Sequence, residues 1–196
     1  MDQLRQISTH RLTGSERLIK SGIETGHSVL GFWQWSSSNL VGNTLRGWLA
    51  EYIVATAIGA EEGIREEWDS FDLSTPEGIR VEVKSSAYIQ SWKQKALSTP
   101  RFDIRCTIAW DEATGKREAG QSRHSDVSVF CLLHHMDPDT LNPLHLDQWT
   151  FLIAATSLIN QLGDQKTAGL STIRKIGAIE VPYDEIASTI GSFYPN

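Results

Sequence analysis

The chain has 196 residues, of which 40% are hydrophobic, so it can bury one substantial core and is short for two. Its formal net charge of −6 argues against a passive, sequence-independent DNA coat, because such proteins bind phosphates mainly through Lys and Arg. An enzyme that concentrates carboxylates around a metal ion is compatible with an acidic chain.

Charge is segregated along the chain. Residues 51–82 contain nine acidic side chains and two Arg, whereas residues 91–125 contain seven basic and four acidic side chains. Because those seven are spread over more than thirty residues, we expect only two or three of them to contact a phosphate backbone. The seven basic residues are Lys93, Lys95, Arg101, Arg105, Lys116, Arg117 and Arg123.

Two features bear on the cellular compartment. The first residues contain no apolar run, and no stretch of about 18 apolar residues occurs, so we expect a soluble protein without membrane contact. Cys106 and Cys131 are too few and too isolated for a disulfide framework. We therefore expect them to be core residues of a cytoplasmic protein.

Residues 1–40 are polar except for an apolar patch at residues 29–35, and a break follows at residues 36–39. We treat residues 1–40 as an N-terminal extension of a single domain that covers residues 1–196.

A helix is predicted from Asn43 or Thr44, either of which can cap it, to about Ile58, with Gly59 as its end. The spacing of its larger side chains predicts one face that packs on the core. The residues expected on this face are Leu45, Leu49, Tyr52, Ile53 and Thr56.

Two short segments, residues 68–73 and 79–85, are predicted to pair as an antiparallel hairpin. Pro76 and Gly78 lie between them and suit a turn.

Three more strands are predicted, at residues 102–108, 127–133 and 150–156. The last two are continuously apolar, as central strands buried on both faces are. A closing helix is predicted from Pro182, in its first turn, to about Gly191. Together these elements predict an α/β fold.

Candidate chemistry lies on the second segment of the hairpin. Strand alternation sends Glu82 and Lys84 to one face and the two flanking valines to the other. Asp72 can reach the same face from across the hairpin, and two carboxylates beside a Lys suit Mg²⁺ at a phosphate. Lys84 would orient or deprotonate the attacking water, or neutralise developing charge. The alternative is a solvated face with a cross-strand ion pair.

Asp69 competes with Asp72 for this role. Along a strand the two side chains point to opposite faces, so only one of them can join Glu82. We favour Asp72 because it lies beside the turn.

Two other patterns are assigned no chemistry. Asp164-Gln165-Lys166 repeats the acid-x-Lys spacing, but it follows Gly163 without β-branched neighbours and is predicted to be a loop. A second group could be combined on paper into a zinc site, but it lacks a Cys/His pair at a standard interval. Its members are Cys131, His134, His135, Asp137, His145 and Asp147.

The motif at Asp72 and Arg80-Val81-Glu82-Val83-Lys84 resembles the core motif of the restriction-endonuclease-like PD-(D/E)xK nuclease superfamily, with Phe71 in place of the usual Pro. The preceding helix is similar to the first core helix of resolvase-like members, where a Glu often completes the metal site. The motif-bearing core covers about residues 44–92.

The resemblance implies a restriction-endonuclease-like core with a central mixed β-sheet flanked by helices. It also implies a DNA endonuclease that uses Mg²⁺, with Mn²⁺ as a substitute. The implied catalytic residues are Asp72, Glu82, Lys84, Glu51 and Gln90, and the implied metal-binding residues are Asp72, Glu82, Val83 and Glu51. A solvated Glu51 and a merely polar Gln90 are the alternatives.

Residues after the motif are candidates for DNA contact through phosphate binding and stacking. They are Ser85, Tyr88, Trp92, Lys93, Lys95 and Arg101. A homodimer is plausible, since cutting two strands often requires two active sites. The competing functions are a catalytically silent nuclease-fold module that binds nucleic acid or protein, and an interaction protein with a chance acid-x-Lys strand.

Overall fold

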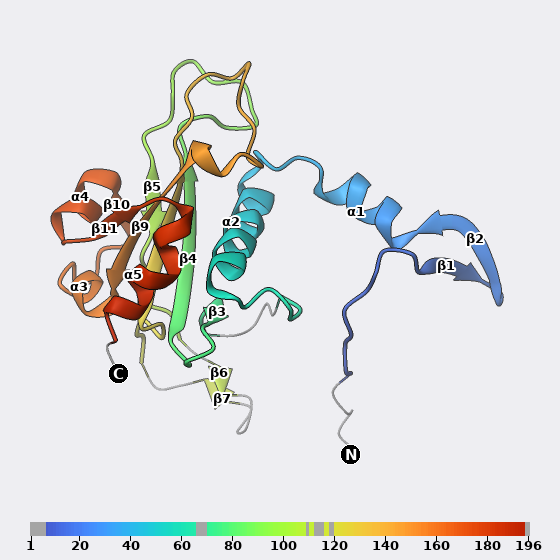
Figure 1. Ribbon diagram of the computed structural model, residues 1–196, viewed down its shortest axis with the longest axis horizontal. Helices are drawn as coiled ribbons and strands as arrows, with labels where there is room; N and C mark the ends of the chain where they lie inside the picture. The colour runs from blue at the N-terminus through green and yellow to red at the C-terminus, as the bar shows by residue number, and fades with distance from the viewer. Residues whose placement is uncertain (1–6, 66–69, 109, 112–115, 118–119, 195–196) are drawn as a thin grey trace. The chain divides into compact units, whose positions relative to one another are not determined.

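The computed structural model of the chain divides into two compact units (Figure 1). The smaller unit comprises residues 1–39 with 63–65, and the larger comprises residues 40–62 with 66–196. The structure describes residues 7–65, 70–108, 110–111, 116–117 and 120–194.

The smaller unit consists of a hairpin and a helix. Its elements are β1 (Arg17–Lys20), β2 (Ile23–Ser28) and α1 (Val29–Ser37), and the two strands pair antiparallel. Ser28 caps α1, because its Oγ accepts a hydrogen bond from the Gly31 N–H. The apolar patch of the sequence is therefore a helix, although none of its residues is buried.

The larger unit is built around a mixed five-stranded sheet with the order β11-β9-β8-β4-β3. Strands β4 and β8 are parallel, and the other neighbours pair antiparallel. The predicted α/β core, with a central mixed sheet flanked by helices, is confirmed. The strands are β3 (Leu73–Ser74), β4 (Arg80–Ala87), β8 (Val127–Leu133), β9 (Trp149–Ala155) and β11 (Ile179–Val181).

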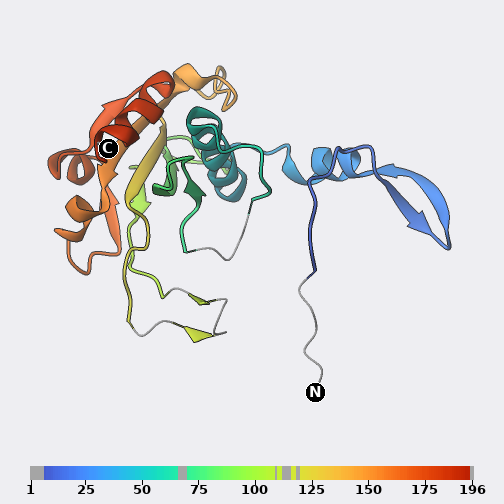
Figure 2. The ribbon, with the colours of Figure 1, turned by 60° about the horizontal axis from the view of Figure 1, so that its bottom comes forward.

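Both faces of this sheet are covered (Figure 1, Figure 2). One face packs against α2 (Asn43–Ile58) and α5 (Ile186–Ser192). Elements of the opposite face are α3 (Thr156–Asn160), α4 (Leu170–Lys175), β5 (Arg101–Asp103) and β10 (Thr167–Gly169). The remaining short elements are β6 (Trp110–Asp111), β7 (Lys116–Arg117), η1 (Leu146–Gln148) and η2 (Tyr183–Glu185).

Both predicted central strands are confirmed. All seven residues of β8 are buried, and β9 lies between β8 and β11. A strand buried on both faces has no solvent side, which explains its continuous apolar run.

The limits of α2 are confirmed, and Gly59 ends it in the left-handed conformation. Two details were wrong. Gly42 occupies the N-cap position, so neither Asn43 nor Thr44 caps the helix. The buried face is also rotated relative to the predicted one: Tyr52 is 53% exposed, because the sheet packs against smaller side chains. The buried residues are Arg46, Ala50, Ile53, Val54, Ala55 and Ile58.

Two predicted strands were too long, and the predicted closing helix is not continuous. The strand predicted at 68–73 is confined in the described residues to β3, and Ser70 to Asp72 form bends. The strand predicted at 102–108 ends at Asp103, where the carboxylate accepts the Arg105 N–H and turns the chain locally. The closing helix is divided into η2 and α5. Asp164 to Lys166 form no strand, in agreement with the loop prediction.

None of the helices in the described part of the chain combines the length and the apolar composition that a membrane crossing requires.

Two glycines of α2 should respond oppositely to replacement by Ala. A Cβ at Gly47 meets no atom within 4 Å, so Gly47→Ala should raise the free energy of unfolding by about 0.5–1 kcal/mol through helix propensity. Gly59 has φ +70°, so Gly59→Ala should lower it by about 1 kcal/mol. Urea denaturation measures the free energy of unfolding of both variants. An unchanged value in Gly59→Ala would contradict the left-handed backbone conformation at the end of α2.

Candidate active site

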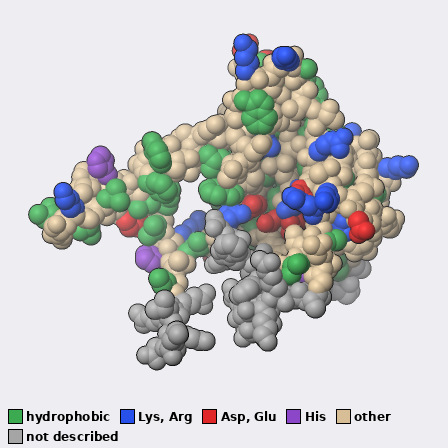
Figure 3. Space-filling view, turned by 180° about the vertical axis from the view of Figure 1, so that it is seen from behind, with side chains coloured by type: hydrophobic (Ala, Val, Ile, Leu, Met, Phe, Trp, Pro, Cys, Tyr) green, Lys and Arg blue, Asp and Glu red, His purple; other side chains and the backbone are tan. Residues whose placement is uncertain are grey.

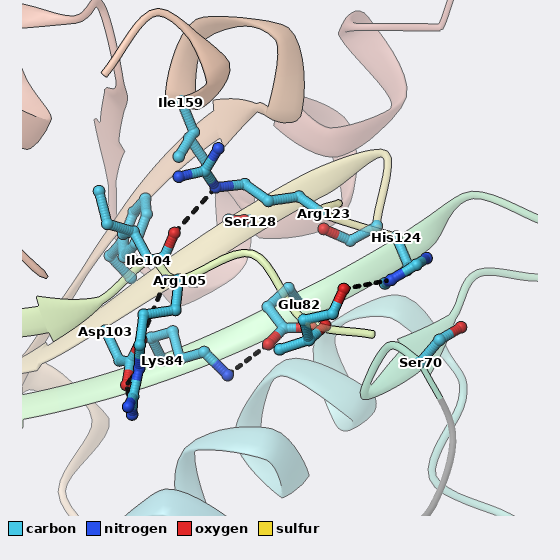
Figure 4. Close-up of a pocket in the computed structure, with 13 residues that line it drawn as sticks. Ser70, Glu82, Lys84, Asp103, Ile104, Arg105, Arg123, His124, Ser128 and Ile159 are labelled. Carbon is cyan, nitrogen blue, oxygen red and sulfur yellow. Dashed lines mark hydrogen bonds and ion pairs between the residues drawn. The ribbon is translucent and has the colours of Figure 1, made fainter. Parts of the chain in front are cut away.

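Strand β4 presents two different faces. Val81 and Val83 are buried against the α2 side of the sheet. Glu82 and Lys84 project from the other face, where their side chains are 27% and 32% exposed and form an ion pair (Figure 4). The predicted alternation of the motif is therefore present in the structure.

Asp72 reaches β4 through both its backbone and its side chain. Its N–H donates to the Val81 carbonyl at 3.1 Å, and its Oδ2 accepts the Val83 N–H at 2.7 Å. Within the described part of the chain, Oδ1 accepts no hydrogen bond. Asp72 therefore has one oxygen committed to the strand and one left for a ligand. The competing Asp69 lies outside the described residues.

The Glu82 carboxyl is partly buried and lies near both negative and positive charges. Burial raises the pKa of this carboxyl, and the negative charges of Asp72 and Glu51 raise it further, whereas Lys84 lowers it. The net pKa lies above the ordinary value. Removing this carboxylate from water beside like charges is unfavourable, and a bound cation would offset that cost.

Lys84 keeps its proton in this environment. Burial lowers its pKa, but attraction to Glu82, Asp72 and Asp103 outweighs burial, so the pKa lies above the ordinary value. The ammonium group is therefore suited to stabilise negative charge and poorly suited to accept a proton.

Glu82 and Lys84 line a pocket that we call the active-site pocket (Figure 4). Asp103, Arg105, Arg123 and His124 form part of its wall. The other lining residues are Ser70, Ile104, Thr107, Ser125, Ser128, Phe130 and Ile159. On the face of the molecule seen in Figure 3, acidic side chains lie directly beside Lys and Arg side chains.

The carboxylates fit a hard cation that retains waters. Among the described residues, no three or more His, Cys, Asp or Glu side chains form a group that could hold a metal ion. Magnesium needs fewer protein ligands, because it is usually held by one or two carboxylates together with water and phosphate oxygens. Asp72 and Glu82 could supply such a pair. Glu51, half-buried on α2, acts on Glu82 through its charge.

Two of the three histidines considered as zinc ligands have other hydrogen-bond partners. His134 Nδ1 lies 2.8 Å from Thr150 Oγ1, and His135 Nε2 lies 2.7 Å from Thr140 Oγ1. Cys131 is buried in the core as predicted, and Cys106 is half-buried.

Gln90 is held by the protein itself. Its Oε1 accepts from Arg46 Nη1 at 3.3 Å, and its Nε2 donates to the Ala87 carbonyl at 2.9 Å. Arg46 also approaches Ser85, with 3.4 Å between Nε and Oγ. Both ends of the Gln90 amide are thus used for internal hydrogen bonds, and Ser85 faces α2 with the valines.

The other candidates for DNA contact lie outside the active-site pocket. Trp92, Lys93 and Lys95 are exposed on the segment that follows β4. Tyr88 and Arg101 line a second groove. Where these five side chains meet DNA, they would do so away from Glu82 and Lys84.

Sequence patterns missed Asp103 and His124 as pocket residues. A signal existed for Asp103: in the sequence, Asp103 and Arg105 alternate with the apolar Phe102 and Ile104, and both apolar side chains are buried. No local pattern identifies His124, whose Nε2 lies 3.1 Å from the Thr107 carbonyl. Its position depends on chain segments that pack only in the folded state.

Comparison with known proteins gives one family. The model of the family described as Bacteriophage T4 endonuclease IV matches residues 3–172, which is well over half of the chain. No curated protein sequence matches the chain.

The two oxygens of Asp72 can be separated by mutation. Asp72→Ala leaves the buried Val83 N–H without an acceptor, so the free energy of unfolding should fall by about 1–3 kcal/mol. Asp72→Asn retains an acceptor oxygen for this N–H, so its free energy of unfolding should fall clearly less. Urea denaturation of the two variants in the absence of divalent metal gives their free energies of unfolding. An equal fall in both would show that the hydrogen bond to Val83 contributes nothing to stability.

Proposed function

The chain belongs to the bacteriophage T4 endonuclease IV family, and we infer from this membership that the protein is an endonuclease that cuts DNA. We further propose that it hydrolyses phosphodiester bonds with Mg²⁺ in the manner of PD-(D/E)xK nucleases. The observation that supports this proposal is that Asp72 binds the backbone of β4 at Val83 and acts through its charge on both Glu82 and Lys84, which form an ion pair.

Asp72 and Glu82 would hold the metal ion, with Mn²⁺ as a substitute. When bound, the ion supplies polarisation of a non-bridging phosphate oxygen and a lower pKa for an attacking water. The neighbouring negative charges that help to raise the pKa of Glu82 support this assignment. These carboxylates repel one another, and a bound cation would balance their charge. Glu51 adds to the negative potential, and the Val83 carbonyl remains a further candidate ligand.

Lys84 would stabilise the charge that develops on the phosphate during attack. Its raised pKa supports this role over that of a general base, because the ammonium remains protonated at neutral pH. The ion pair with Glu82 holds the ammonium beside the proposed ligand. Substrate phosphate and Lys84 would therefore meet directly next to the metal ligands.

Cleavage assays test the assignment with a matched control inside the chain. Lys84→Ala should lower kcat at least about 100-fold, as the loss of a charge-stabilising group does. Lys166→Ala, in the second acid-x-Lys triplet, should cleave like the wild type because Lys166 lies in a turn outside the pocket. Linear, circular, single-stranded and branched DNA should be compared with Mg²⁺, Mn²⁺ and chelator.

A thermal-shift measurement separates metal binding from turnover. Mg²⁺ or Mn²⁺ should raise the Tm of the wild type by mass action, and this rise should vanish in Glu82→Gln. Full activity in both Lys84→Ala and Asp72→Asn would exclude the proposed centre. A wild type that binds DNA but cleaves no substrate would instead favour a catalytically silent module.

We also propose that the active species is a homodimer whose contact uses the smaller unit. That unit exposes apolar side chains from both its hairpin and α1, and Figure 3 shows many hydrophobic side chains on it. Its residues 7–39 carry three basic and two acidic side chains, so they offer little attraction to a polyanion. A second copy would cover these side chains and supply the second active site.

Light scattering tests this assembly. The wild type should have twice the monomer mass of 21.9 kDa at micromolar concentration. Trp35→Ser, which removes a side chain that is 85% exposed on α1, should shift the mass toward the monomer. Leu144→Ser, at an exposed apolar site of the larger unit, should not. A monomeric wild type would refute the proposal.

A further inference from the structure

The structure separates the seven basic residues of segment 91–125 by position. Arg105 and Arg123 line the active-site pocket together with Glu82 and Lys84 (Figure 4). Lys93, Lys95 and Arg101 lie outside it. The side chains of Lys116 and Arg117 are not described by the structure. Two guanidinium groups therefore line the same pocket as Glu82 and Lys84.

Arg105 is held at the pocket by one carboxylate. Its backbone N–H donates to Asp103 Oδ1 at 3.0 Å, its Nε lies 2.8 Å from Asp103 Oδ2, and its Nη2 also contacts this oxygen. The side chain is 61% exposed. Exposed ion pairs are weak, because water screens them on both sides. A phosphate, which accepts the same two parallel N–H bonds, can compete with Asp103 for Arg105.

Arg123 is held by neutral groups. Its Nε donates to the Ile104 carbonyl at 2.9 Å, Nη1 to Asn160 Oδ1 at 2.9 Å, and Nη2 to the Gly163 carbonyl at 3.3 Å. Within the described part of the chain, no carboxylate pairs with it. The orientation of Arg123 is thus fixed by neutral groups, and its positive charge can attract an anion in the pocket.

Asp103 occupies the position between two cations. Its carboxylate binds Arg105, and its charge also acts on Lys84. In the absence of DNA, the Asp103 carboxylate holds the Arg105 guanidinium at the pocket. The same carboxylate opposes an incoming phosphate until Arg105 is transferred from Asp103 to the phosphate.

We propose that Arg105 and Arg123 bind the DNA phosphate next to the scissile bond, and that Asp103 is a counter-ion which this phosphate displaces from Arg105. This inference rests on the proposed nuclease function, because it assumes that DNA enters the pocket of Glu82 and Lys84. No bond is made or broken in the exchange. One charge-assisted pair is replaced by another.

The effects on DNA binding should differ in sign. Arg105→Gln and Arg123→Gln should each weaken binding about tenfold, whereas Asp103→Asn should tighten it several-fold. Each Arg replacement should also reduce the slope of log Kd against log salt by about one, as the loss of one phosphate contact does. Fluorescence anisotropy with labelled DNA, measured in the cleavage-deficient Lys84→Ala background, gives both quantities.

Lys175 provides the control. It is exposed in the last turn of α4 and lines neither the active-site pocket nor the groove that contains Tyr88 and Arg101. Lys175→Gln should therefore change neither the affinity nor the salt slope, although it also removes one positive charge.

A double-mutant cycle tests the displacement itself. If Asp103 acts by holding Arg105, the tightening by Asp103→Asn should disappear in the Arg105→Gln background. The same tightening in both backgrounds would overturn the counter-ion role, because Asp103 would then act on DNA directly. Equal affinities and slopes for Arg105→Gln, Arg123→Gln and Lys175→Gln would overturn the phosphate-binding wall.

These outcomes are distinct from failure of the proposed function. Cleavage that persists in Lys84→Ala and Asp72→Asn would reject the catalytic centre, whatever the anisotropy shows. Loss of cleavage in those variants, together with unchanged binding in Arg105→Gln and Arg123→Gln, would leave the centre intact and reject only the phosphate wall.

Discussion

The parallel pairing of β4 with β8 is the constraint on which the site depends. It runs in unbroken register from Val81 beside Val127 to Ala87 beside Leu133. Asp126 fixes the start of this register, because its carboxylate accepts hydrogen bonds from the backbone and side chain of Arg80. A shift by one residue would turn Glu82 and Lys84 into the α2 core and the valines into the pocket. Burial of the valines therefore positions the chemical groups.

The fold holds charges together that would separate in water. Burial and the charges of two nearby carboxylates, Asp72 and Glu51, raise the pKa of Glu82, and the ammonium of Lys84 does not fully offset their combined effect. Such an arrangement costs stability and is typical of sites that bind a charged ligand. The same reasoning extends to Asp103 and Arg105, whose exposed pair is geometrically well formed and energetically weak.

Local patterns were sufficient for some elements and insufficient for others. The run of residues 127–133 identified a central strand, and Gly59 marked the end of α2, because both depend on neighbouring residues alone. The buried face of α2 depends on which side chains fit against β4, and that choice favoured Ala50 over Tyr52. Pairing of β5 with β10 joins segments more than sixty residues apart, so the local alternation around Asp103 could indicate its polar face but could not place that face at the pocket.

The short length of β3 has a consequence for the candidate active site. A strand over the whole predicted segment would have covered the outer edge of β4 with backbone hydrogen bonds. Instead β3 pairs with β4 only at Val81 and Arg80, and the next outward N–H, that of Val83, is satisfied by the Asp72 carboxylate. At this edge of the sheet, the Asp72 side chain therefore accepts the hydrogen bond that a longer β3 would accept through its backbone. This substitution brings a carboxylate to β4 on the strand that carries Glu82 and Lys84.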